Sequence, residues 1–241
     1  MPSGKGKGFM KNQRLSDLKR FYDLMAALEA KQGGTRTLAE ENRRDWPHRG
    51  IYFFQESTER RTESGAGLRI VRVGTHAVSK GSKTKLWDRL SQHRGQLKSG
   101  GGNHRGSVFR KIVGLSLLAR EKLDFPTWGE GGTAKREIRL REHPLEVSVS
   151  RYIGAMPFLW LEVDDEPGAN SLRKSIERNA IALLSNYSNN PPVDRASSEW
   201  LGHFCPKEDI PRSGLWNSDH VDEVPNSSFL EDMQRLIMEM K

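Results

Sequence analysis

The chain has 241 residues, enough for one large domain or one domain with additions. Lys and Arg total 39 against 31 acidic residues, and the net charge of +8 favours a polyanionic partner such as nucleic acid, although a basic surface can also serve solubility alone. The single cysteine, Cys205, excludes an internal disulfide and a cysteine-rich zinc site and fits a cytoplasmic location. The longest apolar run, residues 153–163, is too short to cross a membrane, so we expect no membrane partner.

The first part of the chain predicts a helix followed by a hairpin. Residues 1–13 are basic and rich in glycine with little to bury, so we expect a disordered tail. A helix is predicted from 16 to about 30, where apolar residues recur at helical spacing between a serine cap and a glycine pair. Strands are predicted at 51–54 and 68–73, joined by a long hairpin loop.

The middle of the chain is less regular. A glycine-rich segment at 99–107 predicts a flexible link, and residues 124–150 fit no pattern beyond a short helix. A near-continuous apolar run at 155–163 is typical of a buried central strand. The remaining predicted elements are helices at 83–97, 107–122, 171–184 and 229–240.

This order of elements predicts an α+β fold: a small three-stranded antiparallel sheet flanked by helices, with additions at both ends. After the tail we expect an N-terminal helical extension at 14–47. The core should span 48–190 with an insertion at about 99–150, and a C-terminal extension should follow at 191–241.

A tyrosine and a glycine mark the two strands of the hairpin. Tyr52 lies in the run R-G-I-Y-F-F, and a strand tyrosine by itself is more often a packing residue than a catalytic one. Gly74 ends the second strand in R-I-V-R-V-G-T, where a missing side chain permits a sharp exit or a close approach of a ligand.

The helix at 83–97 carries basic side chains on one face. Lys85, Arg89 and His93 are spaced four residues apart, so they project together beside an apolar stripe. An arginine can hold a phosphate by two parallel hydrogen bonds, and a histidine can donate to it or relay a proton. An ordinary solvated basic face fits the same pattern, and this helix alone does not decide between them.

The helix at 171–184 carries one carboxylate at the edge of its apolar stripe. A half-buried carboxylate is costly unless it is paired. Glu177 can pair with Arg173, four residues earlier, as an ordinary helix salt bridge. Alternatively, it can bind a hard divalent cation such as Mg²⁺.

Together these pieces resemble the GIY-YIG nuclease superfamily. In chain order they are Gly50-Ile51-Tyr52, Val73-Gly74-Thr75, the helix from Leu86 through Arg89 to His93, and Glu177 on a late helix. The resemblance covers roughly residues 48–190, and a histidine four residues after the arginine is most similar to the restriction-enzyme branch. It implies a catalytic site of Tyr52, Arg89, His93 and Glu177, with a single Mg²⁺ or Mn²⁺ on Glu177.

The chain departs from the family pattern at Arg72, which stands where the second tyrosine would be. A literal Y-I-G does occur at Tyr152-Ile153-Gly154, but it is too far along the chain to form a hairpin with Tyr52. Arg72 can stabilise charge at a phosphate, but it is a poor general base because it stays protonated. Tyr52 or His93 must then act as the base, or the protein is inactive. We predict that Tyr52 lies within hydrogen-bond reach of His93 or of a water beside the metal, and that Arg72 points into the same cleft.

A late asparagine also belongs to the family pattern. We favour Asn190 for this position over the other candidates, which are Asn186, Asn189 and Asn217. His203 and Cys205 look like half of a metal site, but no second half exists and packing is the better interpretation.

The resemblance implies a metal-dependent endonuclease that hydrolyses DNA, most simply double-stranded DNA. We expect Lys85, Arg89, His104 and Arg105 to contact the nucleic acid. A homodimer is compatible with this reading, and restriction, mobile-element and phage-defence roles all stay open. The alternative is a GIY-YIG fold that has lost cleavage and keeps DNA binding.

Overall fold

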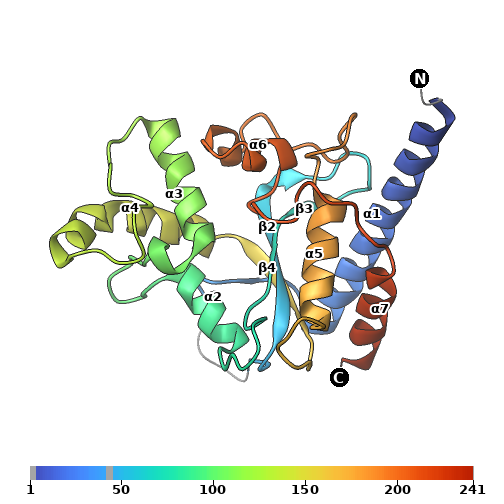
Figure 1. Ribbon diagram of the computed structural model, residues 1–241, viewed down its shortest axis with the longest axis horizontal. Helices are drawn as coiled ribbons and strands as arrows, with labels where there is room; N and C mark the ends of the chain where they lie inside the picture. The colour runs from blue at the N-terminus through green and yellow to red at the C-terminus, as the bar shows by residue number, and fades with distance from the viewer. Residues whose placement is uncertain (1–3, 42–45, 241) are drawn as a thin grey trace.

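The computed structural model describes residues 4–41 and 46–240, and the fold is α+β as predicted. A four-stranded antiparallel sheet forms its centre (Figure 1). Its order is β1-β4-β2-β3, with β1 at Arg36–Thr37, β2 at Gly50–Arg60, β3 at Leu68–Gly74 and β4 at Pro157–Glu162. The two-residue edge strand β1 adds to the three predicted strands, and it is too short to show a period in the sequence.

The hairpin of β2 and β3 sets the register of the candidate residues. Tyr52 is opposite Gly74, and Phe54 is opposite Arg72. Because positions two apart along a strand share a face, Tyr52 and Arg72 lie on the same face of the sheet. Strand β2 continues to Arg60 through an irregular register, so part of the predicted hairpin loop is strand.

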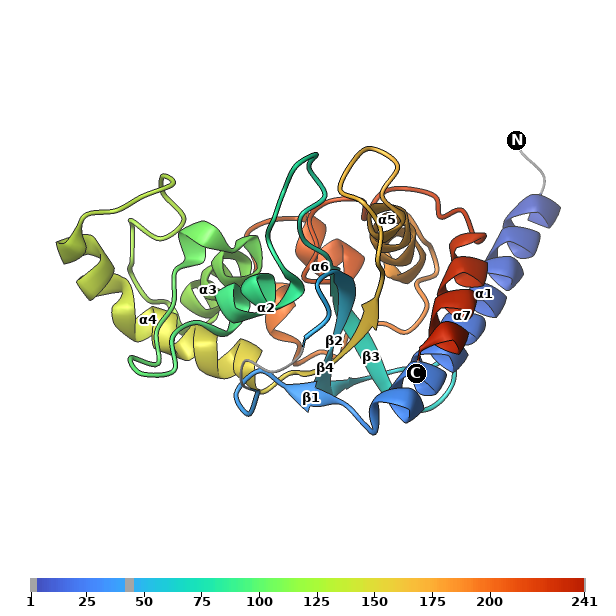
Figure 2. The same ribbon diagram turned by 90° about the horizontal axis from the view of Figure 1, so that it is seen from below.

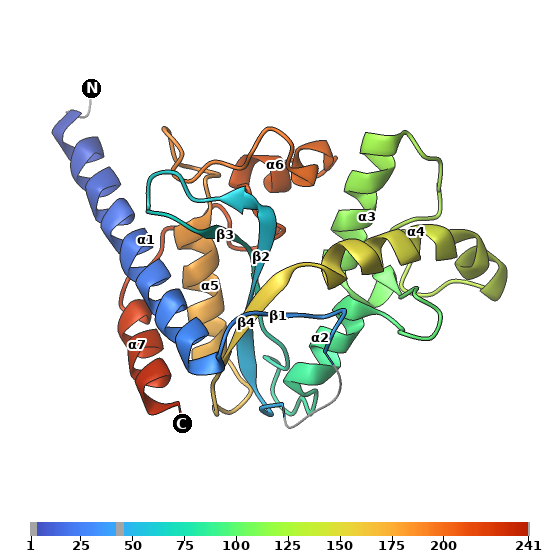
Figure 3. The same cartoon turned by 180° about the vertical axis from the view of Figure 1, so that it is seen from behind.

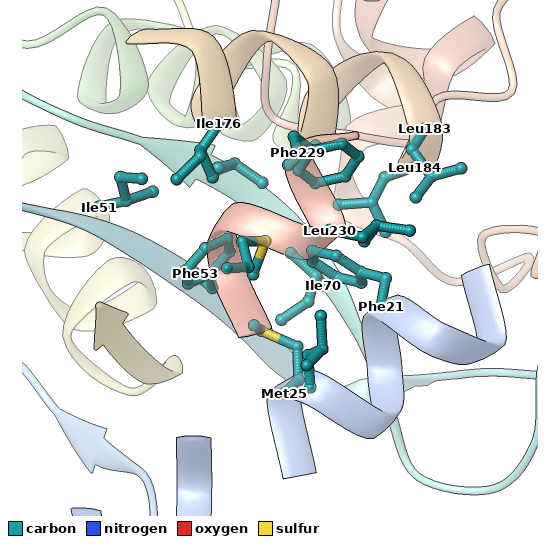
Figure 4. Close-up of a cluster of buried hydrophobic side chains, with 14 of the residues drawn as sticks. Phe21, Met25, Ile51, Phe53, Ile70, Ile176, Leu183, Leu184, Phe229 and Leu230 are labelled. Carbon is teal, nitrogen blue, oxygen red and sulfur yellow. The ribbon is translucent and has the colours of Figure 1, made fainter. Parts of the chain in front are cut away.

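Three helices cover the face of the sheet that carries Ile51 and Phe53. They are α1 (Gly4–Gln32), α5 (Leu172–Leu184) and α7 (Phe229–Glu239). Their apolar side chains form one hydrophobic cluster with those of the strands, as Figure 4 shows. Alternation along β2 sends Tyr52 and Phe54 to the opposite face.

Helix α1 begins well before the predicted start at residue 16. Residues 1–3 lie outside the described part of the chain, but from Gly4 onward the prediction of a disordered tail over 1–13 is wrong. The apolar stripe from Leu18 to Leu28 is buried against the core. Adding residues to an anchored helix is much easier than nucleating one, which explains why the helix extends into a segment with no apolar stripe of its own.

The face with Tyr52 and Phe54 packs against α2 (Leu86–Arg94), α3 (Val108–Glu121) and α4 (Arg136–Gly154). Helices α3 and α4 project from the sheet on the side away from α1 and α7, and we call this projection the arm (Figures 2 and 3). The remaining helices are short: η1 (His104–Gly106), η2 (Leu201–Phe204) and α6 (Asp209–Ser213). Within residues 4–41 and 46–240, no helix is long and apolar enough to span a membrane.

Helix α4 is far longer than the short helix expected within 124–150. Exposed charges in its first half interrupt the apolar stripe by which a helix is recognised. The literal Y-I-G lies in the last turn of this helix, at Tyr152-Ile153-Gly154, and not on a strand. The interpretation of that match as accidental is therefore confirmed.

A buried ionic network joins α2, α3 and α4. Arg110 is fully buried, donates to a carboxylate oxygen of Glu146 at 3.0 Å and donates to the carbonyl oxygen of His93 at 2.8 Å. Glu146 also accepts a hydrogen bond at 2.9 Å from Nδ1 of His104. A Cβ at Gly102 would lie 2.2 Å from the guanidinium carbon of Arg110, so the glycine-rich segment is a close-packed support and not a flexible link.

Residues from all three predicted segments, 14–47, 48–190 and 191–241, contribute to the cluster of Figure 4. The positions of the domain boundaries stay a prediction. In packing terms, the terminal helices help to bury the sheet.

We expect Phe229→Ala to lower the free energy of unfolding by about 3–5 kcal/mol, because the side chain is 2% exposed and its ring packs near that of Phe21. Urea denaturation measures this. The control Val224→Ala removes a side chain that is 91% exposed and should change stability by less than about 0.5 kcal/mol. If Phe229→Ala is as stable as this control, the conclusion that the C-terminal helix contributes to the core is contradicted.

Candidate active site

The Tyr52 side chain crosses from β2 over β3 at Gly74. A Cβ at Gly74 would lie only 2.3 Å from the Tyr52 hydroxyl oxygen. That distance is far inside van der Waals contact, so only glycine lets the phenol pass. The close approach that the sequence predicted at Gly74 is therefore made by the protein's own tyrosine and not by a ligand.

The phenol reaches helix α2. Tyr52 Oη and His93 Nε2 are 2.8 Å apart, which confirms the prediction that the two residues lie within hydrogen-bond reach. The other ring nitrogen, Nδ1, is 2.8 Å from Oγ of Ser107, the N-cap residue of α3. Burial, followed by the charges of three nearby arginines, holds the pKa of His93 well below its ordinary value, so the imidazole is neutral at neutral pH.

Arg72 lies on the same side of the sheet as Tyr52, as predicted. Its guanidinium donates to a backbone carbonyl and lies over the ring of Phe109, 4.6 Å from the ring centroid. Burial lowers the pKa of Arg72, the neighbouring Tyr52 and Glu177 oppose this shift, and Arg89 adds to it. Arg72 is therefore a fixed cation beside the tyrosine, and its buried Nε has no partner in the described part of the chain.

Arg89 projects from α2 one turn before His93 and is partly exposed. Its Nη1 donates to the side chain of Gln92 at 3.1 Å and to the carbonyl oxygen of Gly106 at 3.2 Å. Its Nε is buried and finds no partner among residues 4–41 and 46–240. Its Nη2 forms no hydrogen bond to these residues either, so the guanidinium keeps N–H groups that no described protein group uses.

Glu177 connects α5 to the end of β3. Its Oε1 accepts a hydrogen bond from the backbone N–H of Thr75 at 3.0 Å. The ordinary helix salt bridge does not form, because Arg173 pairs instead with Asp165. Burial raises the pKa of Glu177 against the lowering effects of Arg72, the Thr75 N–H, His220 and Arg89, and the carboxylate forms no ion pair among the described residues.

This carboxylate fits a divalent cation as a single ligand. Its second oxygen, Oε2, has no hydrogen-bond partner among the described residues, and a Mg²⁺ ion often takes one carboxylate and fills its other positions with water and phosphate oxygens. Within the described ranges no group of three or more His, Cys, Asp or Glu side chains could hold a metal. Cys205 is buried in the core and His203 bonds to a backbone carbonyl, in agreement with a packing role.

The structure brings Asn217, and not Asn190, to the end of β3. Asn190 is exposed, and its side chain has no hydrogen bond to any described residue. The amide of the buried Asn217 donates to the carbonyl of Val73 at 2.9 Å and accepts from its N–H at 3.1 Å. The contact arises because the chain after α6 folds back along β3, and no local sequence signal announces it.

Two of the predicted nucleic-acid contacts are wrong. Lys85 is exposed, but His104 is buried, bonded through both ring nitrogens and stacked on Trp128 at a centroid distance of 3.8 Å. The guanidinium of Arg105 is enclosed and forms hydrogen bonds of 2.6 and 2.9 Å with Glu142. Both side chains hold the loops of the arm together and cannot reach DNA.

The open cleft that we expected beside Tyr52 is also wrong. Tyr52 is 1% exposed and His93 is fully buried, whereas Arg89 and Glu177 are partly exposed. A cavity of about 530 Å³ does exist, but it lies at the far end of β2, between α3, α4 and Trp200. Arg89 and Glu177 are therefore closer to solvent than the phenol of Tyr52 and the imidazole of His93.

Comparison with known proteins identifies the same family. The family model of the GIY-YIG domain matches residues 12–241, which is nearly the whole chain. No functionally curated protein and no solved structure matches the chain. GIY-YIG domains are of nuclease type and generally depend on a divalent metal. Because the family model matches nearly the whole length of the chain, the chain belongs to the GIY-YIG domain family.

Proposed function

We propose that this GIY-YIG protein is a divalent-metal-dependent endonuclease that hydrolyses phosphodiester bonds in DNA. The observation that supports this best is the convergence of three elements on the end of β3. Tyr52 from β2 bonds to His93 of α2, and Glu177 of α5 bonds to the residue after Gly74. The proposal includes restriction, mobile-element and phage-defence roles and does not choose among them.

Each side chain has a distinct task in this proposal. Glu177 would hold Mg²⁺ or Mn²⁺, which when bound stabilises negative charge on the phosphate. Arg89, with its unpaired N–H groups, would bind the phosphate and stabilise the charge that develops on it. Tyr52 would orient the attacking water, and either Tyr52 or His93 would take its proton. The resemblance implies 5′-phosphate and 3′-hydroxyl products.

A second candidate function is DNA binding without cleavage. Two observations favour it: Arg72 replaces the second tyrosine of the family, and Tyr52 is buried. In an endonuclease, the water must reach the Tyr52 hydroxyl after DNA binds, as catalytic contacts often form only in the substrate complex. Cleavage and binding assays therefore have to be run on the same preparations.

The arm offers a surface for the DNA duplex in place of His104 and Arg105. Basic side chains in the first turns of α4 are exposed and form no ion pair among the described residues; they are Lys135, Arg136, Arg139 and Arg141. Unpaired cations on a projecting helix bind phosphates mainly through the release of counterions from the duplex. We therefore assign nucleic-acid contacts to this helix as well as to Lys85 and Arg89.

Supercoiled plasmid should be nicked in the presence of Mg²⁺, and Glu177→Gln should abolish nicking while DNA affinity stays within about threefold, because a metal ligand is lost but the arginines remain. Gel analysis of the plasmid and an anisotropy titration of a labelled duplex measure the two properties. The matched control Glu231→Gln makes the same change on α7, away from the site, and should cleave like wild type.

The outcomes separate the two candidate functions. A wild-type protein that binds duplex tightly but never nicks it with Mg²⁺ or Mn²⁺ would support the inactive DNA-binding protein. A Glu177→Gln variant that nicks as fast as wild type would remove Glu177 from the proposed site.

We expect the double substitution Arg136→Gln with Arg139→Gln to weaken duplex binding and to reduce the slope of log K against log salt by about 0.9 for each phosphate that the variant no longer neutralises. Nicking at saturating DNA should change little, because neither residue belongs to the catalytic group. The charge-matched control Arg20→Gln with Arg235→Gln lies on α1 and α7 at the other end of the molecule (Figure 1). Equal salt slopes for the two double variants would rule out the arm as a DNA surface.

A further inference from the structure

The buried imidazole of His93 links two hydroxyl groups in a row. Tyr52 Oη is 2.8 Å from Nε2, and Ser107 Oγ is 2.8 Å from Nδ1. All three side chains are at most 1% exposed. Ser107 also caps helix α3 by accepting the backbone N–H of Arg110 at 3.3 Å.

Only one ring nitrogen of His93 can carry a hydrogen. Burial, and then the positive charges of Arg89, Arg72 and Arg110, holds the pKa of this imidazole well below its ordinary value. A neutral imidazole has one donor nitrogen and one acceptor nitrogen, and its surroundings decide which is which. The two hydroxyl groups and the imidazole carry three hydrogens but share only two hydrogen bonds. One hydroxyl hydrogen therefore needs an acceptor outside this row of three side chains.

The two ends of this chain differ in what surrounds them. The Ser107 hydroxyl is enclosed at the start of α3, and in the described part of the chain its hydrogen has no acceptor other than His93 Nδ1. A buried donor left without an acceptor is costly. The Tyr52 hydroxyl lies at the candidate active site, where a water or a phosphate oxygen can accept its hydrogen once substrate is bound.

We propose that Ser107 is a positioning residue that donates its hydroxyl hydrogen to Nδ1 and so fixes His93 as the Nε2–H tautomer. The imidazole then donates to Tyr52 Oη, beside the guanidinium of Arg72. Resting on the proposed nuclease function, this assigns the base to Tyr52 and makes His93 a donor. For Tyr52 to act as the base, its hydroxyl proton must first pass to solvent; the phenolate oxygen then takes one proton from the attacking water and becomes a phenol again, while Nε2–H of His93 donates to it throughout.

This arrangement also gives a reason for Arg72. An arginine cannot relay a proton as the family's second tyrosine could, but its fixed positive charge lies beside the Tyr52 oxygen, where negative charge would develop in the proposed reaction. Tyr52, His93 and Ser107 then form one hydrogen-bonded row, in which Ser107 donates to His93 and His93 donates to Tyr52, with Arg72 beside the phenol. The sequence signal for Ser107 is its position as a serine cap directly before an apolar helix.

The tautomer can be read by NMR on full-length protein with ¹⁵N-labelled histidine, bound to a DNA duplex in the absence of metal. His93→Gln identifies the resonances of His93 among those of the seven histidines. We expect a protonated Nε2 and a bare Nδ1 in wild type, the same pattern in Ser107→Thr, and loss of the single pattern in Ser107→Ala. Ser171→Ala removes the N-cap of α5 instead and should leave the His93 tautomer unchanged.

A wild-type His93 with its hydrogen on Nδ1 would overturn the proposal, and so would a Ser107→Ala variant with an unchanged tautomer. If Ser107→Ala does not fold, the wild-type spectrum still decides. In nicking assays Ser107→Ala should lower kcat and not KM, losing part of the roughly 10²–10⁴-fold effect of a positioned base. Absence of any nicking by wild type would defeat the proposed function but leave the tautomer assignment standing.

Discussion

The structure of the site depends on one steric constraint, the passage of the Tyr52 phenol over Gly74. With any side chain at position 74, the ring would be pushed off β3 and could not reach Nε2 of His93. The same strand end presents the backbone N–H of Thr75 to Glu177 and receives the amide of Asn217 at Val73. A single glycine at the end of β3 therefore lets side chains from the sheet, α2 and α5 meet.

The arm is tied to this centre by buried charge. Arg110 holds the carbonyl oxygen of His93 and the carboxylate of Glu146, so α2, α3 and α4 cannot shift independently. Breaking a buried ion pair of this kind on one side is strongly destabilising. A duplex that contacts the exposed arginines of α4 would thus be held by an element rigidly connected to the helix that carries Arg89 and His93.

The sequence predicted the elements whose apolar period is regular and the family motifs that lie on them. Tyr52, Arg89, His93 and Glu177 all lie on predicted strands or helices, and the contact between Tyr52 and His93 follows from that order. The missed features come from contacts distant in sequence. His104 and Arg105 were predicted to be accessible because they lie in a glycine-rich segment, but the glycines there make room for the buried Arg110. Asn217 reaches β3 only because the C-terminal segment folds back along that strand.

The proposed function requires Tyr52 and His93 to act as one hydrogen-bonded unit in DNA cleavage, and a double-mutant cycle tests this requirement most directly. Single-turnover nicking rates with Mg²⁺ would be measured for Tyr52→Phe, His93→Gln and the double variant. We expect the double variant to be no slower than the slower single variant, which corresponds to a coupling energy of about 0.5–3 kcal/mol. Losses that simply add would contradict the account, because the two side chains would then contribute independently.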